Sequence, residues 1–268
     1  MGKIVAFANQ KGGVGKTTTC INIAGYLSVM GKKVLVVDLD SQGSATSGLG
    51  IDKNQDYITM YDAICGENEI TEVIQKTFLH NLDIVPATVD LAGAEIELVQ
   101  MKNREHVVKN ILEKVKKSYD YILIDCPPSL GLLTVNALTA CDTVMIPIQC
   151  EFFALEGLSQ LMNTIKLVKK HLNDNIDVEG VILTMKDNRS NLIQQVSQEI
   201  QRFFGEKVYK ASVPRTIRLA EAPSHGQPIM IYDPKGKGGV AYMEVTREFL
   251  KRNNDNYKAT ALKPFGSK

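Results

Sequence analysis

Near the start of the chain, a glycine-rich segment lies between two different periodic patterns. Residues 11–18 read Lys-Gly-Gly-Val-Gly-Lys-Thr-Thr, with the apolar run 3–8 before them and the helical pattern 16–30 after them. Glycines let successive backbone N–H groups turn inward, and the first turn of a helix adds partial positive charge. This order of strand, glycine loop and helix predicts a loop that binds phosphate groups.

The residues of this loop have separate expected tasks. Lys16 is expected to reach the terminal phosphates of a nucleotide, and the Thr17 hydroxyl to ligate Mg²⁺. The whole segment is expected to contact the nucleotide, which assigns this role to Lys11, Gly12, Gly13, Val14, Gly15, Lys16, Thr17 and Thr18. The alternative is a glycine turn that only opens a helix, and the Gly-Lys-Thr ending in this context argues against it.

One lysine departs from the general phosphate-loop pattern. The first glycine of G-x-x-x-x-G-K-[ST] would fall at position 10, which is Gln10, and Lys11 follows it. In a loop of this shape, Lys11 is expected to point away from its own nucleotide and to reach a phosphate held by a second copy. A cation supplied in this way stabilises charge in the transition state, as an arginine finger does.

Three aspartates stand at the ends of apolar strand-like runs. Asp125 ends residues 121–125, where it is expected to hold the Mg²⁺ shell directly or through water. Asp38 and Asp40 follow residues 33–37 and share one side of the strand because Leu39 separates them. Asp38 is the deeper of the two and is expected to support the metal. The alternative for all three is that they only cap strand ends.

Strand-like and helix-like patterns alternate along the chain, which indicates βαβ units around a parallel sheet. The predicted fold is a single α/β domain, a doubly wound, mainly parallel sheet flanked by helices, covering residues 1–252. Residues 253–268 are expected to form a polar C-terminal tail. The expected strands are 3–8, 33–38, 81–86, 121–125, 143–148 and 178–184, the helices 16–30, 104–117, 155–171, 191–204 and 242–252, and the loop 39–50.

The composition predicts a cytoplasmic protein. The apolar runs are strand-sized and too short to span a bilayer, and the N-terminus lacks the pattern of a signal peptide. Five scattered cysteines without a C-x-x-C pair are expected to be reduced. The net charge of +1 hides an asymmetry: residues 1–179 have 16 Lys and Arg against 22 Asp and Glu, and residues 180–268 have 15 against 8. The basic half hints at an anionic partner.

These motifs together resemble the deviant Walker A ATPases, and among them the ParA/Soj partition family. The resemblance extends to about residue 252 and rests on residues 11–18, 37–43, 124–128 and 213–228. It implies an Mg-dependent ATPase that dimerises in its ATP state, with Asp40 orienting the attacking water. It places adenine between Met185 and the segment Pro214, Arg215 and Thr216, and it makes residues 127–131 the sensor of the γ-phosphate. Lys11, Lys16 and Asp40 are then the candidate catalytic residues.

The same resemblance gives the basic half a function. It implies that the ATP-bound dimer binds double-stranded DNA without sequence preference, on the nucleoid, and drives chromosome or plasmid partitioning with a ParB-like protein that stimulates hydrolysis. Few aromatic residues accompany the cations, which indicates phosphate contacts rather than base readout. The resemblance singles out Arg189 and Arg218, and charge adds further candidates. The complete set is Arg189, Arg202, Arg218, Lys235 and Lys237.

Three alternative readings remain at this point. A MinD-like membrane switch needs an amphipathic C-terminal helix, whereas residues 257–268 hold few bulky apolar residues and Pro264 interrupts them. A nucleoid-bound ATPase that positions a protein cargo would carry the same basic face. An iron-protein relative would need a second cysteine suitably placed with Cys126. Because the chain starts almost at the first strand, an N-terminal helix-turn-helix domain is not expected.

Overall fold

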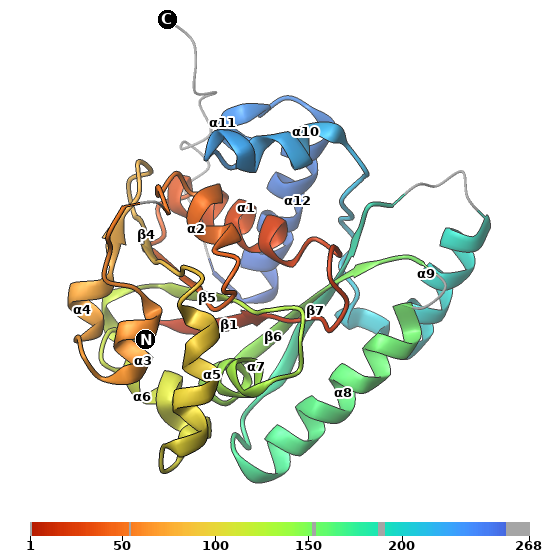
Figure 1. The fold of residues 1–268 in the computed structure, drawn as a ribbon. Helices are drawn as coiled ribbons and strands as arrows, with labels where there is room; N and C mark the ends of the chain where they lie inside the picture. The colour runs from red at the N-terminus through yellow and green to blue at the C-terminus, as the bar shows by residue number, and fades with distance from the viewer. Residues whose placement is uncertain (1, 54, 152–153, 187–190, 256–268) are drawn as a thin grey trace, which may run out of the picture.

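The computed structural model describes residues 2–53, 55–151, 154–186 and 191–255. Within them, seven strands form one sheet in the order β3-β4-β2-β5-β1-β6-β7 (Figure 1). Neighbouring strands run parallel except β3, which pairs antiparallel with β4 at one edge. The strands are β1 (Lys3–Phe7), β2 (Val34–Asp38), β3 (Gln75–Lys76), β4 (Leu82–Val85), β5 (Tyr121–Asp125), β6 (Thr143–Gln149) and β7 (Asp177–Thr184).

The central strands consist of continuous apolar runs because both faces of the sheet are covered. Every residue of β2 and β5 is buried, and side chains alternate between the two faces. On β1, Ile4 and Ala6 belong to one core, whereas Val5 and Phe7 belong to the other. These two cores confirm the predicted doubly wound sheet in a single α/β domain.

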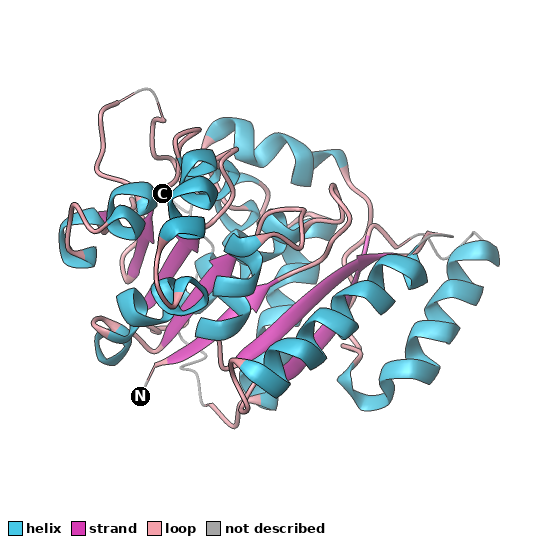
Figure 2. Cartoon of the chain, turned by 60° about the horizontal axis from the view of Figure 1, so that its bottom comes forward, coloured by secondary structure: helices cyan, strands magenta, loops and turns pink. Residues whose placement is uncertain are grey.

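Helices form a layer on each face of the sheet (Figures 1 and 2). One layer contains α1 (Lys16–Val29), α2 (Ser44–Gly48), α10 (Ile217–Glu221), α11 (Ile229–Tyr232) and α12 (Lys237–Arg252). The other contains α3 (Met60–Cys65), α4 (Ile70–Val73), α5 (Leu91–Gln100), α6 (Val107–Glu113), α7 (Leu132–Ala140), α8 (Ala154–His171) and α9 (Asn191–Phe204). Gly2 and Asp255, the two ends of the described chain, line a hollow together with Tyr121, where β5 begins.

Helix α1, which follows the glycine loop, is held against the sheet by α12. Tyr242 of α12 is buried and its hydroxyl is 3.1 Å from the Thr19 hydroxyl of α1. The Tyr26 hydroxyl donates to the Gly239 carbonyl at 2.7 Å. These buried polar contacts fix the direction in which α1 leaves the loop, because a buried hydroxyl without a partner is costly.

Most predicted elements are confirmed, but three predictions are wrong in part. The expected loop 39–50 contains the short helix α2, because Asp38 pairs with the Thr46 backbone and hydroxyl and stabilises a helical turn there. The expected helix 104–117 is divided into the 3₁₀ turn Arg104–His106, helix α6 and the 3₁₀ turn Lys116–Ser118. Helix α12 starts five residues before the predicted residue 242. Its first turn contains Gly238 and Gly239, which lack side chains and so allow close contact with Leu219 and with the Asp233 carbonyl.

The carboxyl ends of β1, β2 and β5 meet at one edge of the sheet. Asp125, the last residue of β5, is in register with Phe7 of β1 on one side and with Asp38 of β2 on the other. The loops that leave these three strands therefore start side by side. In parallel α/β sheets this edge is where ligands bind.

Candidate nucleotide-binding site

The loop between β1 and α1 has a backbone that only glycine adopts easily. Gly13 and Gly15 have φ angles of 74° and 87°, in the left-handed region that disfavours side chains. The Asn9 side chain donates to the Pro147 carbonyl at 2.8 Å and accepts from the Lys11 amide at 3.0 Å. The Thr184 hydroxyl donates to the Val14 carbonyl at 2.8 Å. Strands β6 and β7 thus hold the loop in shape.

Lys16 opens α1 and turns its ammonium back over the loop. The residue is 7% exposed, and its Nζ donates to the Lys11 carbonyl at 3.3 Å. Burial lowers the pKa of Lys16, while the nearby Asp125 carboxylate raises it. A buried ammonium at this position is a suitable partner for the terminal phosphates of a nucleotide.

Asp125 has a buried carboxylate that the described residues leave without hydrogen bonds. It is 0% exposed, and neither of its oxygens has a partner. Burial raises its pKa well above the usual value, and the Asp38 carboxylate adds to the rise. The nearby Thr17 hydroxyl and Lys16 ammonium lower this pKa. An unsatisfied buried carboxylate beside a threonine hydroxyl fits the donor set that Mg²⁺ prefers.

Asp38 lies in register with Asp125, but its oxygens are occupied. One oxygen accepts from the Thr46 amide at 2.9 Å and from the Thr46 hydroxyl at 2.8 Å, and the other accepts from the Asp40 amide at 3.2 Å. Burial raises the pKa of Asp38 to about 6, against the lowering effect of these hydrogen bonds. Thr46 was not among the predicted site residues, and no spacing in the sequence links it to position 38.

Asp40 lies at the entrance of the site. Its side chain accepts from the Gln42 amide at 3.0 Å, and its carbonyl accepts from the Gly43 amide at 2.8 Å. Both bonds bend the chain into a tight turn directly after β2. The carboxylate is partly exposed, in contrast to the two buried aspartates behind it.

Lys11 forms an ion pair with Glu151 in the single chain. Glu151 follows β6, so the pair connects the phosphate loop to the next loop along the sheet edge. The two side chains are 36% and 48% exposed, which leaves the ammonium accessible from outside. The sequence did not point to Glu151, because it lies 140 residues from Lys11.

The predicted adenine-binding residues come together at the end of β7. The Lys186 amide donates to the Val213 carbonyl at 3.0 Å, and residues 186 and 214 form a parallel bridge. Met185 has a φ of 50°, which turns the chain at this point. Arg215 is exposed, and Thr216 caps α10 by accepting from the Arg218 amide at 3.2 Å.

The proline-rich loop after β5 lies against the phosphate loop. A Cβ atom on Gly12 would lie 3.8 Å from the Pro128 side chain. The Ser129 carbonyl accepts from the Thr134 hydroxyl at 2.6 Å, and residues 127–131 lead into α7. The loop that follows the orphaned carboxylate therefore contacts the loop expected to hold the phosphates.

The predicted DNA-binding cations fall into separate groups. Arg218 pairs with Glu221 at 3.1 Å and lies 5.8 Å from the ring centre of Tyr232. Arg202, on α9, pairs with Glu199 at 2.5 Å. Lys235 and Lys237 line a pocket of about 400 Å³ together with Lys186, a third lysine that the sequence did not single out. Arg189 lies outside the described residues.

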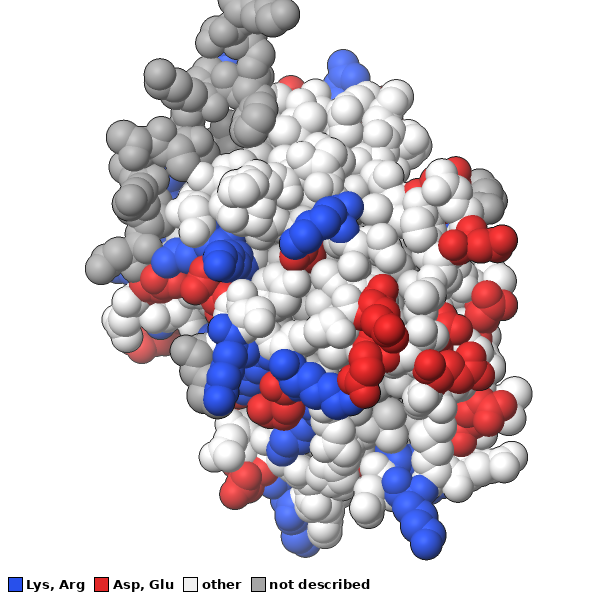
Figure 3. Space-filling view, turned by 90° about the vertical axis from the view of Figure 1, so that its left-hand side faces the viewer, with Lys and Arg blue, Asp and Glu red and all other residues white. Residues whose placement is uncertain are grey.

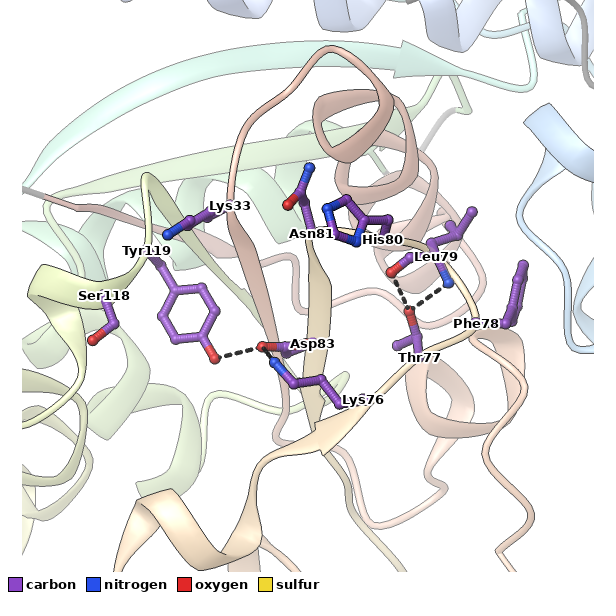
Figure 4. A pocket seen from close by; sticks show the side chains of 10 residues that line it. All are labelled: Lys33, Lys76, Thr77, Phe78, Leu79, His80, Asn81, Asp83, Ser118 and Tyr119. Atoms are coloured by element: carbon purple, nitrogen blue, oxygen red, sulfur yellow. Dashed lines mark hydrogen bonds and ion pairs between the residues drawn. The ribbon is translucent and has the colours of Figure 1, made fainter.

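A second hollow, of about 580 Å³, lies at the opposite edge of the sheet (Figure 4). It is lined by Lys33 and Tyr119 on one side and by the segment around His80 on the other. Asp83 within it accepts from the Lys76 ammonium and from the Tyr119 hydroxyl, each at 2.8 Å. Its carboxylate is satisfied, and none of the predicted nucleotide residues lines this hollow.

Among the described residues, no group of three or more His, Cys, Asp or Glu side chains gathers as a metal site. Mg²⁺ often takes only one or two protein ligands and completes its shell with water and phosphate oxygens, so a magnesium site does not need such a group. No helix in the same ranges is long and apolar enough to cross a membrane. All five cysteines are free.

This geometry defines a phosphate-loop nucleotide hydrolase of the doubly wound α/β class. Residues 2–178 match the AAA domain family. The chain is 56% identical to the sporulation initiation inhibitor protein Soj of Bacillus subtilis, over 92% of this chain and 98% of the relative. It is 48% identical to the chromosome partitioning protein ParA of Caulobacter vibrioides, over 97% and 98%. The chain belongs to the ParA/Soj family of partitioning ATPases.

A solved structure shares this fold. Cobyrinic acid a,c-diamide synthase from Mycobacterium smegmatis, with a bound ATP analogue and magnesium, superposes with a TM-score of 0.83 at 34% identity. The superposition covers 95% of this chain and 96% of the other. The fold and the family predicted from the motifs are thus confirmed.

Proposed function

We propose that this ATPase uses the loop of residues 11–18 to bind ATP and that Thr17 and Asp125 hold its Mg²⁺. The carboxylate of Asp125 carries this proposal, because it is fully buried and has no hydrogen-bond partner among the described residues. When bound, Mg²⁺ would neutralise charge on the phosphate oxygens. Lys16 would bind the terminal phosphates, and Met185 with Pro214, Arg215 and Thr216 would hold the adenine.

We further propose that hydrolysis requires two chains. Asp40, which is partly exposed at the entrance of the site, would orient a water molecule toward the terminal phosphate. Lys11 would leave Glu151 and contact the phosphates of a second copy, where a cation stabilises the developing charge. Nucleotide state would then control self-association, and hydrolysis would separate the copies.

A Lys11→Ala variant tests this role. We expect the variant to bind ATP, to remain monomeric with ATP by light scattering, and to lose most of its turnover. A Glu151→Gln variant is the matched control, since it removes the partner of Lys11 and keeps the ammonium. A Lys11→Ala protein that dimerises and hydrolyses ATP as the wild type does would refute the proposal.

The output of the switch is proposed to be DNA binding that depends on ATP. The basic C-terminal half supplies Arg202, Arg218, Lys235 and Lys237 at the surface, and Arg189 belongs to the same proposal. A dimer would present two such surfaces, which links DNA affinity to nucleotide state. With a ParB-like protein that stimulates hydrolysis, this cycle would partition a chromosome or a plasmid over the nucleoid.

The DNA proposal is tested with a duplex of arbitrary sequence over a series of salt concentrations. We expect binding with ATP only, a steep loss with salt, and at least about tenfold weaker binding by Arg218→Glu. Lys114→Glu is the control, since Lys114 is also exposed and paired with a glutamate. Absence of binding in every nucleotide state would contradict the proposal. Liposome binding would then test the membrane alternative, whose tail lies outside the described residues.

A further inference from the structure

The hollow shown in Figure 4 lies at the amino ends of the central strands, away from the proposed nucleotide site. Residues 76–81, which connect β3 to β4, form one wall, and Lys33, Ser118 and Tyr119 form the other. Lys33 directly precedes β2, whose last residue is Asp38. This strand spans roughly 17 Å by the usual rise per residue, so the two sites are separate. The volume of about 580 Å³ is that of a small-molecule site.

Hydrogen bonds within the chain hold both walls of this hollow in place. Asp83 is 7% exposed and joins the walls, since it accepts from the Lys76 ammonium on one side and from the Tyr119 hydroxyl on the other, each at 2.8 Å. The Thr77 hydroxyl accepts from the Leu79 amide at 3.1 Å. The walls therefore do not have to be ordered when a ligand binds, which favours binding.

Four other polar side chains line the hollow and have no partner within the described residues. They belong to Lys33, His80, Asn81 and Ser118, and none of them forms a hydrogen bond or an ion pair there. The Val34 amide donates to the Asn81 carbonyl at 2.8 Å, which brings Lys33 close to Asn81 and His80. In Figure 4 these three side chains lie along the upper part of the hollow. Three neighbouring donors suit a group with several acceptor oxygens.

The charge balance of the hollow favours an anion. Asp83 is the only acidic residue among the described ones that line it, and the Lys76 ammonium already neutralises this carboxylate. The Asp120 carboxylate accepts from the Lys33 amide at 2.7 Å, but it lines the neighbouring hollow instead. The Lys33 ammonium is exposed and forms no ion pair within the described residues, so it can bind a phosphate group as a point charge.

The Tyr119 ring supplies a flat surface below these donors. The side chain is partly exposed, and its hydroxyl is fixed by the bond to Asp83. Figure 4 looks onto the face of the ring, which none of the other side chains drawn there covers. A nucleobase stacks on such a face, and its polar edge can bond the hydroxyl of the adjacent Ser118.

We propose that this hollow binds a nucleotide at a site separate from the phosphate loop. The phosphate group lies against Lys33, His80 and Asn81, and the base stacks on Tyr119. Because the two sites lie at opposite ends of the strands, one chain can hold a nucleotide in each of them. Binding in the hollow does not require hydrolysis of ATP or self-association.

The surface around the hollow argues against a longer anionic partner. Figure 3 faces the edge of the sheet where β3 and β4 lie. Basic side chains gather near the middle of this face, and acidic side chains gather along its right-hand side. A DNA duplex or a long acidic peptide would extend onto these acids, and like charges disfavour that contact. A nucleotide is small enough to stay within the hollow.

Equilibrium dialysis with radiolabelled GMP tests this site in the full chain, and AMP, CMP and UMP are measured in the same way. ADP and Mg²⁺ are present in excess to occupy the phosphate loop. We expect saturable binding to the wild type and at least about tenfold weaker binding to Lys33→Met, which lacks the ammonium for the phosphate. Lys170→Met is the matched control, because Lys170 is also exposed and unpaired within the described residues, and it should bind as the wild type does.

Two variants of Tyr119 separate the ring from its hydroxyl. Tyr119→Leu removes the stacking surface and should weaken GMP binding by at least about fivefold. Tyr119→Phe loses the same hydrogen bond to Asp83 but keeps the ring, so it should bind GMP within about threefold of the wild type. Urea unfolding of each variant checks that it is folded. An equal loss of binding in both variants would contradict stacking on the ring.

Several results would overturn this second site. One is the absence of saturable binding by all four monophosphates, and another is displacement of GMP by added ADP, which would place GMP in the phosphate loop. Equally tight binding of inorganic phosphate would leave only an anion site, and equally tight binding of hexaglutamate would assign the hollow to acidic peptides. A protein that binds GMP but neither hydrolyses ATP nor dimerises with it would refute the proposed function and leave this site intact.

Discussion

The carboxyl ends of β2 and β5 carry aspartates in the same register, yet the two strand ends differ in how their carboxylates are satisfied. Asp38 accepts three hydrogen bonds, from the Thr46 amide, the Thr46 hydroxyl and the Asp40 amide. Asp125 accepts none within the described residues, although both side chains are fully buried. The hydrogen bonds of Asp38 hold the turn after β2 in shape, whereas the Asp125 carboxylate is the one that fits a bound cation.

The largest expected effect comes from removing the charge at the end of β5. In Asp125→Asn, Mg-dependent ATP turnover should fall by at least about 100-fold, because the carboxylate that fits the metal is lost. The free energy of unfolding without nucleotide at pH 7 should rise by roughly 1–3 kcal/mol, since an unpaired buried charge is removed.

Steady-state turnover and urea unfolding of the same preparation measure both effects. Asp174→Asn, at an exposed position, is the control and should change neither quantity. If Asp125→Asn keeps its turnover, or is less stable than the wild type, then the carboxylate is satisfied in solution and the comparison fails.

A smaller effect is expected at the end of β2, where the carboxylate depends on Thr46. The Thr46 hydroxyl donates to Asp38 at 2.8 Å and accepts from the Ala87 amide at 2.9 Å. Thr46→Val should therefore lower the free energy of unfolding by about 2 kcal/mol, because it leaves the buried Ala87 amide without a partner and removes one of the three hydrogen bonds to Asp38. The control is Thr139→Val, at an equally buried threonine that bonds only a helix carbonyl, and it should cost well under half as much.

The smallest effect concerns pH. Burial raises the pKa of Asp38 from 3.8 to about 6 and raises that of Asp125 as well. The folded state thus binds protons that the unfolded state has released, so these groups stabilise the protein more as pH falls toward 4 and less as pH rises through 6. Between pH 7 and pH 5.5 the contribution of Asp38 to the free energy of unfolding should increase by about 1 kcal/mol, and Asp125 should change it in the same direction.

Urea unfolding at both pH values, without Mg²⁺, measures this contribution. The double variant Asp38→Asn/Asp125→Asn removes both groups, so the wild type should gain stability relative to it on acidification. A relative loss would mean that the two carboxylates are better solvated than the structure shows.

Motif order and strand patterning were enough to predict the class of fold and to predict that the candidate residues lie at the ends of neighbouring strands. The apolar runs of β1, β2 and β5 can only be covered on both faces, and the glycines before Lys16 permit a backbone that other residues avoid. The helices that the sequence did not predict, such as α2 and α5, are short, with five and ten residues. Their position depends on contacts from distant segments, which periodicity does not record.

The sequence by itself determined which residues stand at the strand ends and in the loop, because strand period and glycine content are local properties. Only the tertiary structure decided that Thr46 satisfies Asp38, that Asp125 has no hydrogen-bond partner among the described residues, and that Glu151 pairs with Lys11. Each of these facts depends on side chains brought together from separate segments, and hydrogen bonds and burial are set by that assembly.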